Sequence, residues 1–359
     1  MKRDLILFIP SIERGGVEKN LFLILNFLQK KFKKIYIITA NANYKKSFGK
    51  KIIVLCPNSH FWVNKKRFFK TLVSIFILVK KFFSKNVIIL SFQSNVSAIL
   101  VSKIFNFKII IRLNTSIRKY IKSYWLKLIY RFCYNLSDEI IVNSIIFKKE
   151  LKKILKLNSV LIYNSYEKSK KKEELKYFKN YKHLKILNIA RLTDQKDQIT
   201  LIKSLKLLLS KNIKFKCCII GTGVKKKFLK EYIFKNKLNK IIKLVGYKND
   251  AKSYIEKSSL FILSSKYEGL PNVLIEAQSK NIPIISSDCP TGPREILLNG
   301  KLGDLFRVGD YKNLCNLIYK FVRNKTTLIA KSKKAQIYLN RFDLEKNCKK
   351  YENIILKYL

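Results

Sequence analysis

Two glutamates, Glu268 and Glu276, lie eight positions apart in the segment SSKYEGLPNVLIEA, residues 264–277. The preceding apolar run LFIL predicts a strand, and Pro271 falls where the next helix begins, because proline tolerates the first helical turn. The amides and the positive dipole end of a helix over 272–279 would bind a diphosphate. Glu268 would then accept hydrogen bonds from sugar hydroxyls, and Glu276 from a ribose.

This spacing resembles the E-x7-E motif of the retaining glycosyltransferase family 4. Members of that family have the GT-B fold, an α/β architecture of two Rossmann-like, doubly wound domains that face each other across a cleft. The likeness extends over nearly the whole chain and implies a nucleoside-diphosphate sugar as donor. Between the two glutamates, the donor-binding residues that it implies are Gly269, Leu270, Pro271, Asn272 and Val273.

A second segment, LNIARLTDQKD at residues 187–197, is similar to the family's strand–Arg–Leu…Lys motif. The resemblance implies that Arg191 and Lys196 contact the diphosphate of the donor. Arginine offers a fork that fits phosphate oxygens, and lysine offers a compact charge. Both would matter most in the transition state, when the leaving nucleoside diphosphate gains negative charge.

Glycines follow several predicted strands, where they allow a close approach of the backbone to a ligand. Gly15 and Gly16 follow the first strand, as a glycine pair does in the family, and would lie near a phosphate or an acceptor. Gly221 and Gly223 lack the third glycine of a dinucleotide fingerprint, so NAD binding is not favoured. The resemblance places these two beside the donor nucleotide, and the backbone at Gly246 and Tyr247 near its base.

Many family members have a histidine after the strand that corresponds to residues 109–113, but this chain reads IIIRLNTS there. Its two histidines, His60 and His183, lie elsewhere. Asn114 occupies the expected neighbourhood and could hydrogen-bond the sugar or the acceptor, although an amide cannot act as a general base. We therefore expect a front-face retaining mechanism, in which a phosphate oxygen of the leaving group takes the proton of the acceptor.

No Asp-x-Asp pair occurs anywhere in the chain. A metal-bound nucleotide diphosphate usually relies on such carboxylates. We therefore expect no metal and no cofactor, and stabilisation of the leaving group by helix amides, Arg191 and Lys196.

The segment SSDCPTGPREIL, residues 286–297, contains Pro290, Gly292 and Pro293, which predict a rigid turn after a strand. It also resembles a subset of these transferases that act in surface-polysaccharide or lipid-linked glycan synthesis. Arg294 and Glu295 would lie near the cleft. A purely structural loop and a direct contact with substrate are both compatible with the pattern.

Short apolar runs alternate with amphipathic, lysine-rich stretches along all 359 residues, which is typical of parallel α/β sheets. The alternation stops at the charged segment from Ser165 to Lys182 and then restarts. We predict an N-terminal, acceptor-side domain over residues 1–165, a linker over 166–182 and a C-terminal, nucleotide-sugar-binding domain over 183–340. The remaining residues, 341–359, form a helix that packs back toward the first domain.

The chain carries 75 lysines and arginines against 23 acidic residues, a formal net charge of +52. Compositional bias and attraction to an anionic membrane both explain this balance. No basic block with aromatics or a known module suggests nucleic-acid binding. Seven cysteines without a CxxC pair indicate a reducing compartment, and no apolar run approaches the roughly 20 residues of a membrane-spanning helix.

Residues 64–85 and 123–134 mix basic residues with large apolar ones, as do helices that lie in a membrane interface. Core packing against the first sheet would require the same residues. If the acceptor is a polyprenyl-linked sugar, the enzyme must reach the membrane. We therefore expect a cytoplasmic protein that is peripheral at the inner face of the cytoplasmic membrane.

Together these patterns predict a retaining hexosyltransferase. The donor would be a UDP-hexose or UDP-N-acetylhexosamine, and the acceptor a glycan or polyprenyl-linked glycan of cell-surface polysaccharide or lipopolysaccharide synthesis. Two alternatives stay open: a nucleotide-sugar epimerase of the same fold, and a non-enzymatic, basic nucleic-acid-binding protein.

Overall fold

The computed structural model describes residues 4–12, 15–44, 48–167 and 184–358. The chain divides into two compact units. The N-terminal unit comprises Met1–Ser165 together with Phe342–Leu359, and the C-terminal unit comprises Tyr166–Arg341. Most of the predicted linker, 166–182, and the histidine at position 183 lie outside the described residues.

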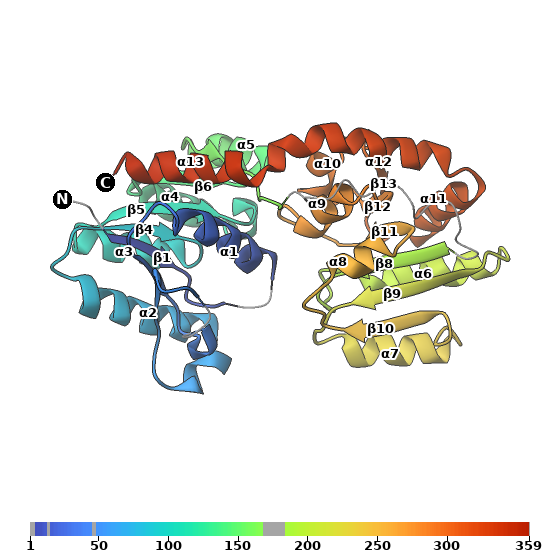
Figure 1. The fold of residues 1–359 in the computed structure, drawn as a ribbon, viewed down its shortest axis with the longest axis horizontal. Helices are drawn as coiled ribbons and strands as arrows, with labels where there is room; N and C mark the ends of the chain where they lie inside the picture. The colour runs from blue at the N-terminus through green and yellow to red at the C-terminus, as the bar shows by residue number, and fades with distance from the viewer. Residues whose placement is uncertain (1–3, 13–14, 45–47, 168–183, 359) are drawn as a thin grey trace. The chain divides into compact units, whose positions relative to one another are not determined.

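The N-terminal unit is built on a seven-stranded, wholly parallel sheet in the order β3-β2-β1-β4-β5-β6-β7 (Figure 1). Its strands are β1 (Asp4–Phe8), β2 (Ile35–Ile38), β3 (Ile52–Leu55), β4 (Val87–Ser91), β5 (Lys108–Leu113), β6 (Glu139–Val142) and β7 (Val160–Leu161). Its α-helices are α1 (Gly16–Leu28), α2 (Arg67–Phe82), α3 (Asn95–Ile104), α4 (Tyr124–Asn135), α5 (Ile145–Leu155) and α13 (Leu344–Leu356). Short 3-10 turns are η1 (Ala42–Tyr44), η2 (His60–Asn64) and η3 (Ile117–Lys119).

Alternate residues of each central strand point into two different cores. Leu5 and Leu7 of β1 join α1 and α13 on one face, whereas Ile6 and Phe8 join α2, α3, α4 and α5 on the other. Strands covered on both faces are apolar at nearly every position, which is why these segments read as continuous hydrophobic runs.

The C-terminal unit contains a six-stranded parallel sheet in the order β10-β9-β8-β11-β12-β13. Its strands are β8 (Leu184–Ile189), β9 (Phe215–Ile220), β10 (Ile242–Gly246), β11 (Leu260–Leu263), β12 (Ile284–Ser287) and β13 (Asp304–Phe306). Its helices are α6 (Gln198–Leu209), α7 (Lys226–Lys235), α8 (Lys252–Glu256), α9 (Asn272–Ser279), α10 (Pro293–Ile296), α11 (Tyr311–Arg323) and α12 (Thr326–Tyr338), followed by the 3-10 turn η5 (Leu339–Phe342).

Both sheets are doubly wound, so the predicted α/β class of two Rossmann-like units is confirmed. In each sheet the strand order reverses once, between β1 and β4 in the N-terminal unit and between β8 and β11 in the C-terminal unit. Ligands of doubly wound sheets bind beyond the carboxyl ends of the strands at this switch point. The loops after β8 and β11 are therefore the first place to look for a site.

The C-terminal helix α13 packs against α1 in the N-terminal unit. Its buried side chains Cys348, Tyr351 and Ile355 join the core on that face of the sheet. Tyr358, just beyond the helix, donates a hydrogen bond of 2.7 Å to the carbonyl of Asp138. The chain thus returns to the first sheet after completing the second.

The segment 117–135, which an apolar periodicity predicts as one helix, does not form a single helix. The segment forms η3 and then α4, which begins only at Tyr124. Ser123 caps α4, because its hydroxyl accepts a hydrogen bond of 3.3 Å from the amide of Leu126. A serine in this position starts a helix rather than continuing one.

Candidate functional site

The loops that follow β8 and β11 are joined to each other at the switch point of the C-terminal sheet. The amide of Lys266 donates to the carbonyl of Gln195 at 2.8 Å, and the Gln195 side chain donates to the carbonyl of Tyr267 at 2.9 Å. The hydroxyl of Ser264 donates to the carbonyl of Lys196 at 3.0 Å. These hydrogen bonds fix the positions of the two loops relative to each other.

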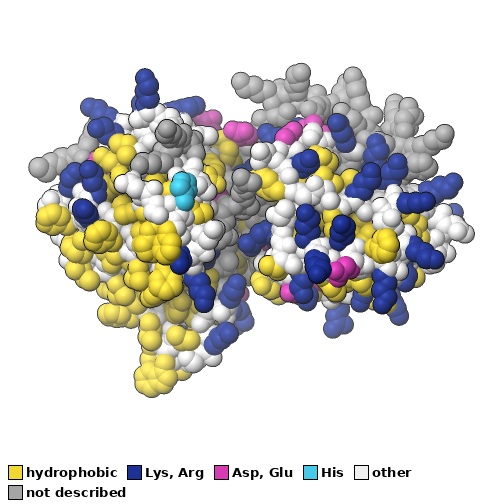
Figure 2. Space-filling view, turned by 90° about the horizontal axis from the view of Figure 1, so that it is seen from below, with side chains coloured by type: hydrophobic (Ala, Val, Ile, Leu, Met, Phe, Trp, Pro, Cys, Tyr) yellow, Lys and Arg dark blue, Asp and Glu magenta, His cyan; other side chains and the backbone are white. Residues whose placement is uncertain are grey.

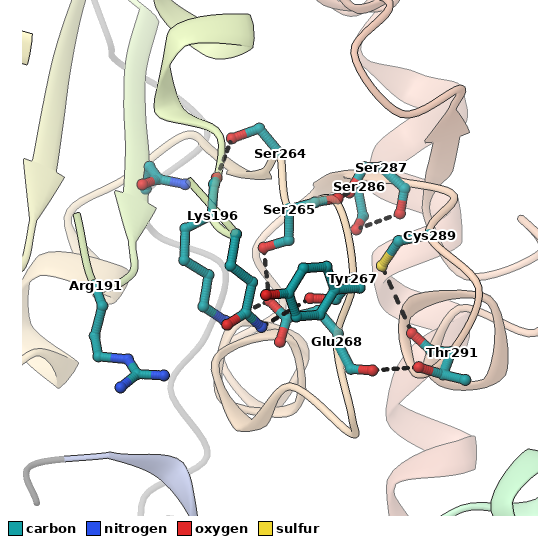
Figure 3. Close-up of polar contacts among 12 residues, drawn as sticks. Arg191, Lys196, Ser264, Ser265, Tyr267, Glu268, Ser286, Ser287, Cys289 and Thr291 are labelled. Carbon is teal, nitrogen blue, oxygen red and sulfur yellow. Dashed lines mark hydrogen bonds and ion pairs between the residues drawn. The ribbon is translucent and has the colours of Figure 1, made fainter. Parts of the chain in front are cut away.

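Within this framework the side chains of Lys196 and Glu268 form an ion pair (Figure 3). Lys196 Nζ lies 2.5 Å from Glu268 Oε1, and the Ser265 hydroxyl donates to the same oxygen at 2.6 Å. The Glu268 side chain is only 6% exposed. Among the described residues, Glu268 Oε2 accepts no hydrogen bond. One carboxylate oxygen is therefore held in place, and the other remains available to a ligand hydroxyl.

The loop after β12 supports the backbone around Glu268. Ser287 donates through its hydroxyl to the carbonyl of Ser265 at 2.6 Å, and Thr291 Oγ1 donates to the carbonyl of Glu268. Gly292 has a φ of +83°, and a Cβ there would lie 2.1 Å from the carbonyl oxygen of Gly269. Only glycine fits this approach, so the segment 286–297 holds the Glu268 loop in position.

Buried beside this network is Cys289. Burial, and secondarily the negative charge of Glu268, raise the pKa of the Cys289 thiol to about 12. The thiol is therefore neutral at physiological pH and is not a nucleophile. Arg294, which follows in the same loop, donates to Asp288 Oδ1 at 2.8 Å, and this ion pair accounts for the arginine without a substrate.

Gly221 and Gly223 follow β9 and pack against the loop after β8. A Cβ at position 221 would lie 2.0 Å from the carbonyl oxygen of Ala190, and one at position 223 would lie 2.3 Å from that of Leu192. Close packing of the two loops therefore explains why glycine is present at both positions, whether or not a nucleotide binds there. Gly246, at the end of β10, has a φ of +82° and open space around it.

Pro271 is the N-cap residue of α9, and no side chain caps the helix. Proline has no N–H, so the helix start presents the amides of the residues after it. Glu276 is half-buried within α9, and Arg191 is exposed in the loop that also carries Lys196 (Figure 3). The predicted donor residues Gly269, Leu270, Asn272 and Val273 lie in or next to the same loop and helix start.

In the N-terminal unit, Gly15 is the N-cap of α1, which begins at Gly16, and again no side chain caps the helix. A Cβ on Gly15 would lie 2.8 Å from Glu18 Oε2. Glu18 is buried in the first turn of α1. A carboxylate therefore already occupies the positive end of this helix dipole.

The Asn114 side chain follows β5 and is held at both ends of its amide. Its oxygen accepts a hydrogen bond from Arg112 Nη1, and its nitrogen donates to the carbonyl of Phe92 at 2.9 Å. Arg112 is 1% exposed and donates further to Tyr351 Oη at 2.7 Å and to Asn164 Oδ1 at 2.6 Å. A buried cation thus anchors Asn114, which is itself half-buried.

Comparison with known proteins shows the family of this chain. The family model for glycosyl transferases group 1 matches residues 167–341. A glycosyltransferase of Methanocaldococcus jannaschii is 33% identical over 309 residues, which cover 79% of this chain and 75% of the relative. The chain belongs to the glycosyl transferases of group 1. It is accordingly an enzyme that transfers a glycosyl group.

One further protein is similar to this glycosyltransferase in sequence, and one solved structure is similar to it in fold. The UDP-Gal:alpha-D-GlcNAc-diphosphoundecaprenol alpha-1,3-galactosyltransferase of Escherichia coli is 26% identical over 165 residues, 45% of this chain and 42% of that protein. The solved structure of HepE from Anabaena, in complex with UDP and glucose, has a TM-score of 0.78 at 16% identity and covers 99% of this chain and 100% of its own. This likeness confirms the GT-B fold.

Several residues around the site of the glycosyltransferase were missing from the sequence-based prediction. Ser265 donates to the Glu268 carboxylate and Thr291 to the Glu268 carbonyl, whereas Ser287 holds the carbonyl of Ser265. The available signal was a serine at or just after the end of a buried strand, as Ser287 ends β12 and Ser265 follows β11. The burial of Arg112 could not be predicted either, because the chain is rich in basic residues that are mostly exposed.

The described residues contain neither a metal-binding cluster nor a membrane-spanning helix. No group of three or more His, Cys, Asp or Glu side chains there could hold a metal ion. The helices of the described ranges are too short or too polar to cross a bilayer. Activity without a metal stays a prediction.

Proposed function

We propose that this glycosyltransferase moves a hexose or N-acetylhexosamine, with retention of configuration, from a UDP-sugar to a glycan or lipid-linked glycan. The observation that carries the proposal is the contact between Lys196 and Glu268 at the switch point of the C-terminal sheet. It joins a cation suited to phosphate and a carboxylate suited to sugar hydroxyls within one buried pair.

Each residue of the pair has a separate task. Glu268 accepts a hydroxyl of the donor sugar through Oε2, while Lys196 and Ser265 hold its other oxygen. Lys196, Arg191 and the amides at the start of α9 stabilise the diphosphate. Removing one preorganised donor to a developing charge typically lowers kcat by about 100-fold to 1,000-fold.

The proton of the acceptor hydroxyl passes to a phosphate oxygen of the departing UDP. The new glycosidic bond forms on the face that the leaving group vacates, so the configuration is retained. This route needs no side-chain base, in keeping with a chain whose two histidines lie at positions 60 and 183. It also needs no metal, and activity should persist in EDTA.

The N-terminal unit is the side that binds the acceptor. Glu18 near Gly15 and Gly16 disfavours a phosphate at the start of α1 and favours neutral hydroxyls, which a carboxylate accepts. Asn114, oriented by Arg112, offers a second polar contact. The E. coli relative acts on a diphosphoundecaprenol-linked sugar, and we place the transfer at the inner face of the cytoplasmic membrane, in surface-polysaccharide or lipopolysaccharide synthesis.

The test combines a donor screen with one matched pair of variants. UDP-, GDP- and dTDP-sugars are compared for thermal stabilisation, which rises with donor concentration over its dissociation constant. Glu268→Gln should lose at least about 100-fold in kcat. Glu256→Gln is the control, because Glu256 lies 2.5 Å from Lys280 Nζ in the same unit and Lys280 follows the far end of α9.

Three outcomes would overturn the proposal. Equal turnover by Glu268→Gln and Glu256→Gln would show that Glu268 has no role in catalysis. A free sugar released without acceptor would indicate an epimerase. Salt-sensitive RNA binding without sugar transfer, unchanged in Glu268→Gln, would indicate a nucleic-acid-binding protein.

A further inference from the structure

Three neighbouring helices of the N-terminal unit present large hydrophobic side chains to solvent. Helix α3 packs against both α2 and α4. Phe76 of α2 is 65% exposed, Ile104 of α3 is 75% exposed and Trp125 of α4 is 73% exposed. The other exposed apolar side chains of this face are Phe68, Phe69, Leu72, Phe83, Leu100, Tyr124, Leu128, Ile129 and Phe132. We call these twelve residues the apolar face.

Helices that cover a core usually present polar side chains to solvent, and the apolar face differs from this pattern. Leu78 and Phe82 of α2 point into the core, yet Phe68, Leu72 and Phe76, spaced four residues apart, form a second stripe on the outside. A helix that is hydrophobic all round is normally buried all round. Exposed apolar patches of this extent mark a surface that binds a partner.

The charge of the apolar face has one sign. Helices α2, α3 and α4 contain no Asp or Glu. The basic residues of these helices that can face a ligand are Arg67, Lys80, Lys81, Lys127 and Arg131. Lys70 is buried against Ser11, and Lys103 pairs with Asp138 at 3.6 Å. Lys80 Nζ lies 5.9 Å from the centre of the Phe76 ring, so cation and aromatic side chain share one surface. Long basic side chains can reach phosphates while their stems lie on apolar material.

We propose that the apolar face docks on an anionic lipid bilayer, with its aromatic side chains in the boundary between headgroups and acyl chains. Figure 2 shows a broad area of hydrophobic side chains on the N-terminal unit, at the left of that view. Trp, Phe and Leu inserted beside a basic rim are the composition of interfacial helices. Anionic headgroups attract the lysines and arginines.

A second copy of the chain fits this face poorly. Pairing two copies through α2, α3 and α4 would bring cations against cations with no carboxylate of these helices to compensate. An anionic bilayer satisfies both the apolar area and the charge. The contact does not rest on the transfer reaction proposed above, and its test needs no sugar donor.

The first experiment is co-sedimentation with vesicles of phosphatidylglycerol and phosphatidylcholine, compared with phosphatidylcholine alone. The full chain should bind the anionic vesicles more tightly. Phe76→Glu combined with Trp125→Glu should weaken that binding by more than about tenfold, because it removes inserted apolar area and adds repelled charge. Phe234→Glu with Ile337→Glu is the matched control, since these residues are 72% and 76% exposed in the C-terminal unit.

The second experiment keeps the native face intact. The chain has two tryptophans, so Trp62→Phe leaves Trp125 as the only reporter. Its emission should shift to the blue and resist acrylamide quenching on anionic vesicles. An unchanged Trp125 spectrum, equal loss of binding in the control variant, or a dimer that dissociates on Phe76→Glu would each overturn the proposal.

Discussion

Lys196 Nζ lies 2.5 Å from Glu268 Oε1, although 72 positions separate the two residues in the chain. They come from the loops after β8 and β11, the two strands between which the order of the sheet reverses. The fold therefore brings a cation and a carboxylate together at the point where doubly wound sheets bind ligands. The pair should also stabilise the fold.

We expect Lys196→Met and Glu268→Gln each to lower the free energy of unfolding, because each leaves or perturbs a buried partner. Breaking a buried ion pair by removing one partner costs about 3–5 kcal/mol. The double variant should lose less than the two single losses together, by at least about 1 kcal/mol. Urea unfolding of all four proteins measures this coupling.

The pair Lys280 and Glu256 supplies the control cycle. Its N–O distance is also 2.5 Å, but the Glu256 side chain is 25% exposed against 6% for Glu268. Lys280→Met with Glu256→Gln should show a coupling below about 1 kcal/mol. Additive losses at Lys196 and Glu268 would mean that the contact contributes nothing to the fold.

Gly221→Ala should destabilise the protein and weaken donor binding. The new methyl group would meet the carbonyl oxygen of Ala190 at 2.0 Å and displace the loop that carries Arg191. We expect a loss of about 2–4 kcal/mol from the clash and the strained backbone. Thermal unfolding and UDP titration by calorimetry measure the two effects.

Gly246→Ala measures the cost of backbone strain alone, without the steric clash expected for Gly221→Ala. Gly246 has a φ of +82°, but no atom lies within 4 Å of the position that a Cβ would take. This variant should lose only about 1 kcal/mol. Should Gly221→Ala behave like Gly246→Ala, the close approach between the two loops would not be tight in solution.

Tyr351→Phe should destabilise the N-terminal unit. Burial raises the pKa of the Tyr351 phenol, although Arg112 opposes this, and the phenol accepts the 2.7 Å hydrogen bond from Arg112 Nε. Removing the Tyr351 hydroxyl leaves the buried Nε of Arg112 without this partner and should lower the free energy of unfolding by about 2–3 kcal/mol. Tyr358→Phe, which loses the hydrogen bond to the carbonyl of Asp138, should cost about 1 kcal/mol.

Urea unfolding of both tyrosine variants is the measurement. A kinetic readout adds what a purely structural role would not change. Because Arg112 also holds Asn114, Tyr351→Phe should raise KM for the acceptor more than KM for the donor. Equal effects on both substrates would exclude a role of Asn114 toward the acceptor.

Much of the fold follows from local pattern, and the exceptions have physical causes. The sequence predicts a C-terminal helix within 341–359, and α13 forms there over Leu344–Leu356, because Asp343 caps it and its apolar residues recur at helical spacing. Helix α12 has no such pattern. Its buried residues are Leu328, Ser332 and Ala335, a face too weakly apolar to reveal a helix.

Part of the candidate site could likewise be predicted from the sequence, and part could not. Glu268 and Lys196 were predicted because each follows a strand in a recognisable motif. The anchoring of Asn114 could not be predicted, since Arg112 and Tyr351 are 239 positions apart and neither belongs to a motif. Contacts of Thr291 and Ser287 with backbone carbonyls depend on the register of adjacent strands, which residue type does not specify.

Two aspartates should change stability in opposite directions when replaced by asparagine. For Asp138, burial by itself raises the pKa, but the Ile109 amide, Lys108 and Lys103 outweigh it and leave the pKa below its usual value of 3.8. A lowered folded-state pKa stabilises the protein above that value, and this contribution is lost as pH falls through the folded pKa. Asp138→Asn should therefore be destabilised at pH 7 by about 1–3 kcal/mol, and the deficit should shrink below pH 3.8.

For Asp197, burial raises the pKa above 3.8 despite the hydrogen bond from Thr200. The folded state then binds protons more tightly than the unfolded chain, so stability falls as pH rises from 3.8 through the folded pKa. Asp197→Asn should remove this loss and be more stable than the parent at pH 7, since asparagine also tolerates the φ of +45°. Urea unfolding between pH 3 and pH 7 compares the two variants, and a destabilised Asp197→Asn at pH 7 would show that the Asp197 carboxylate is favoured by its lysine neighbours after all.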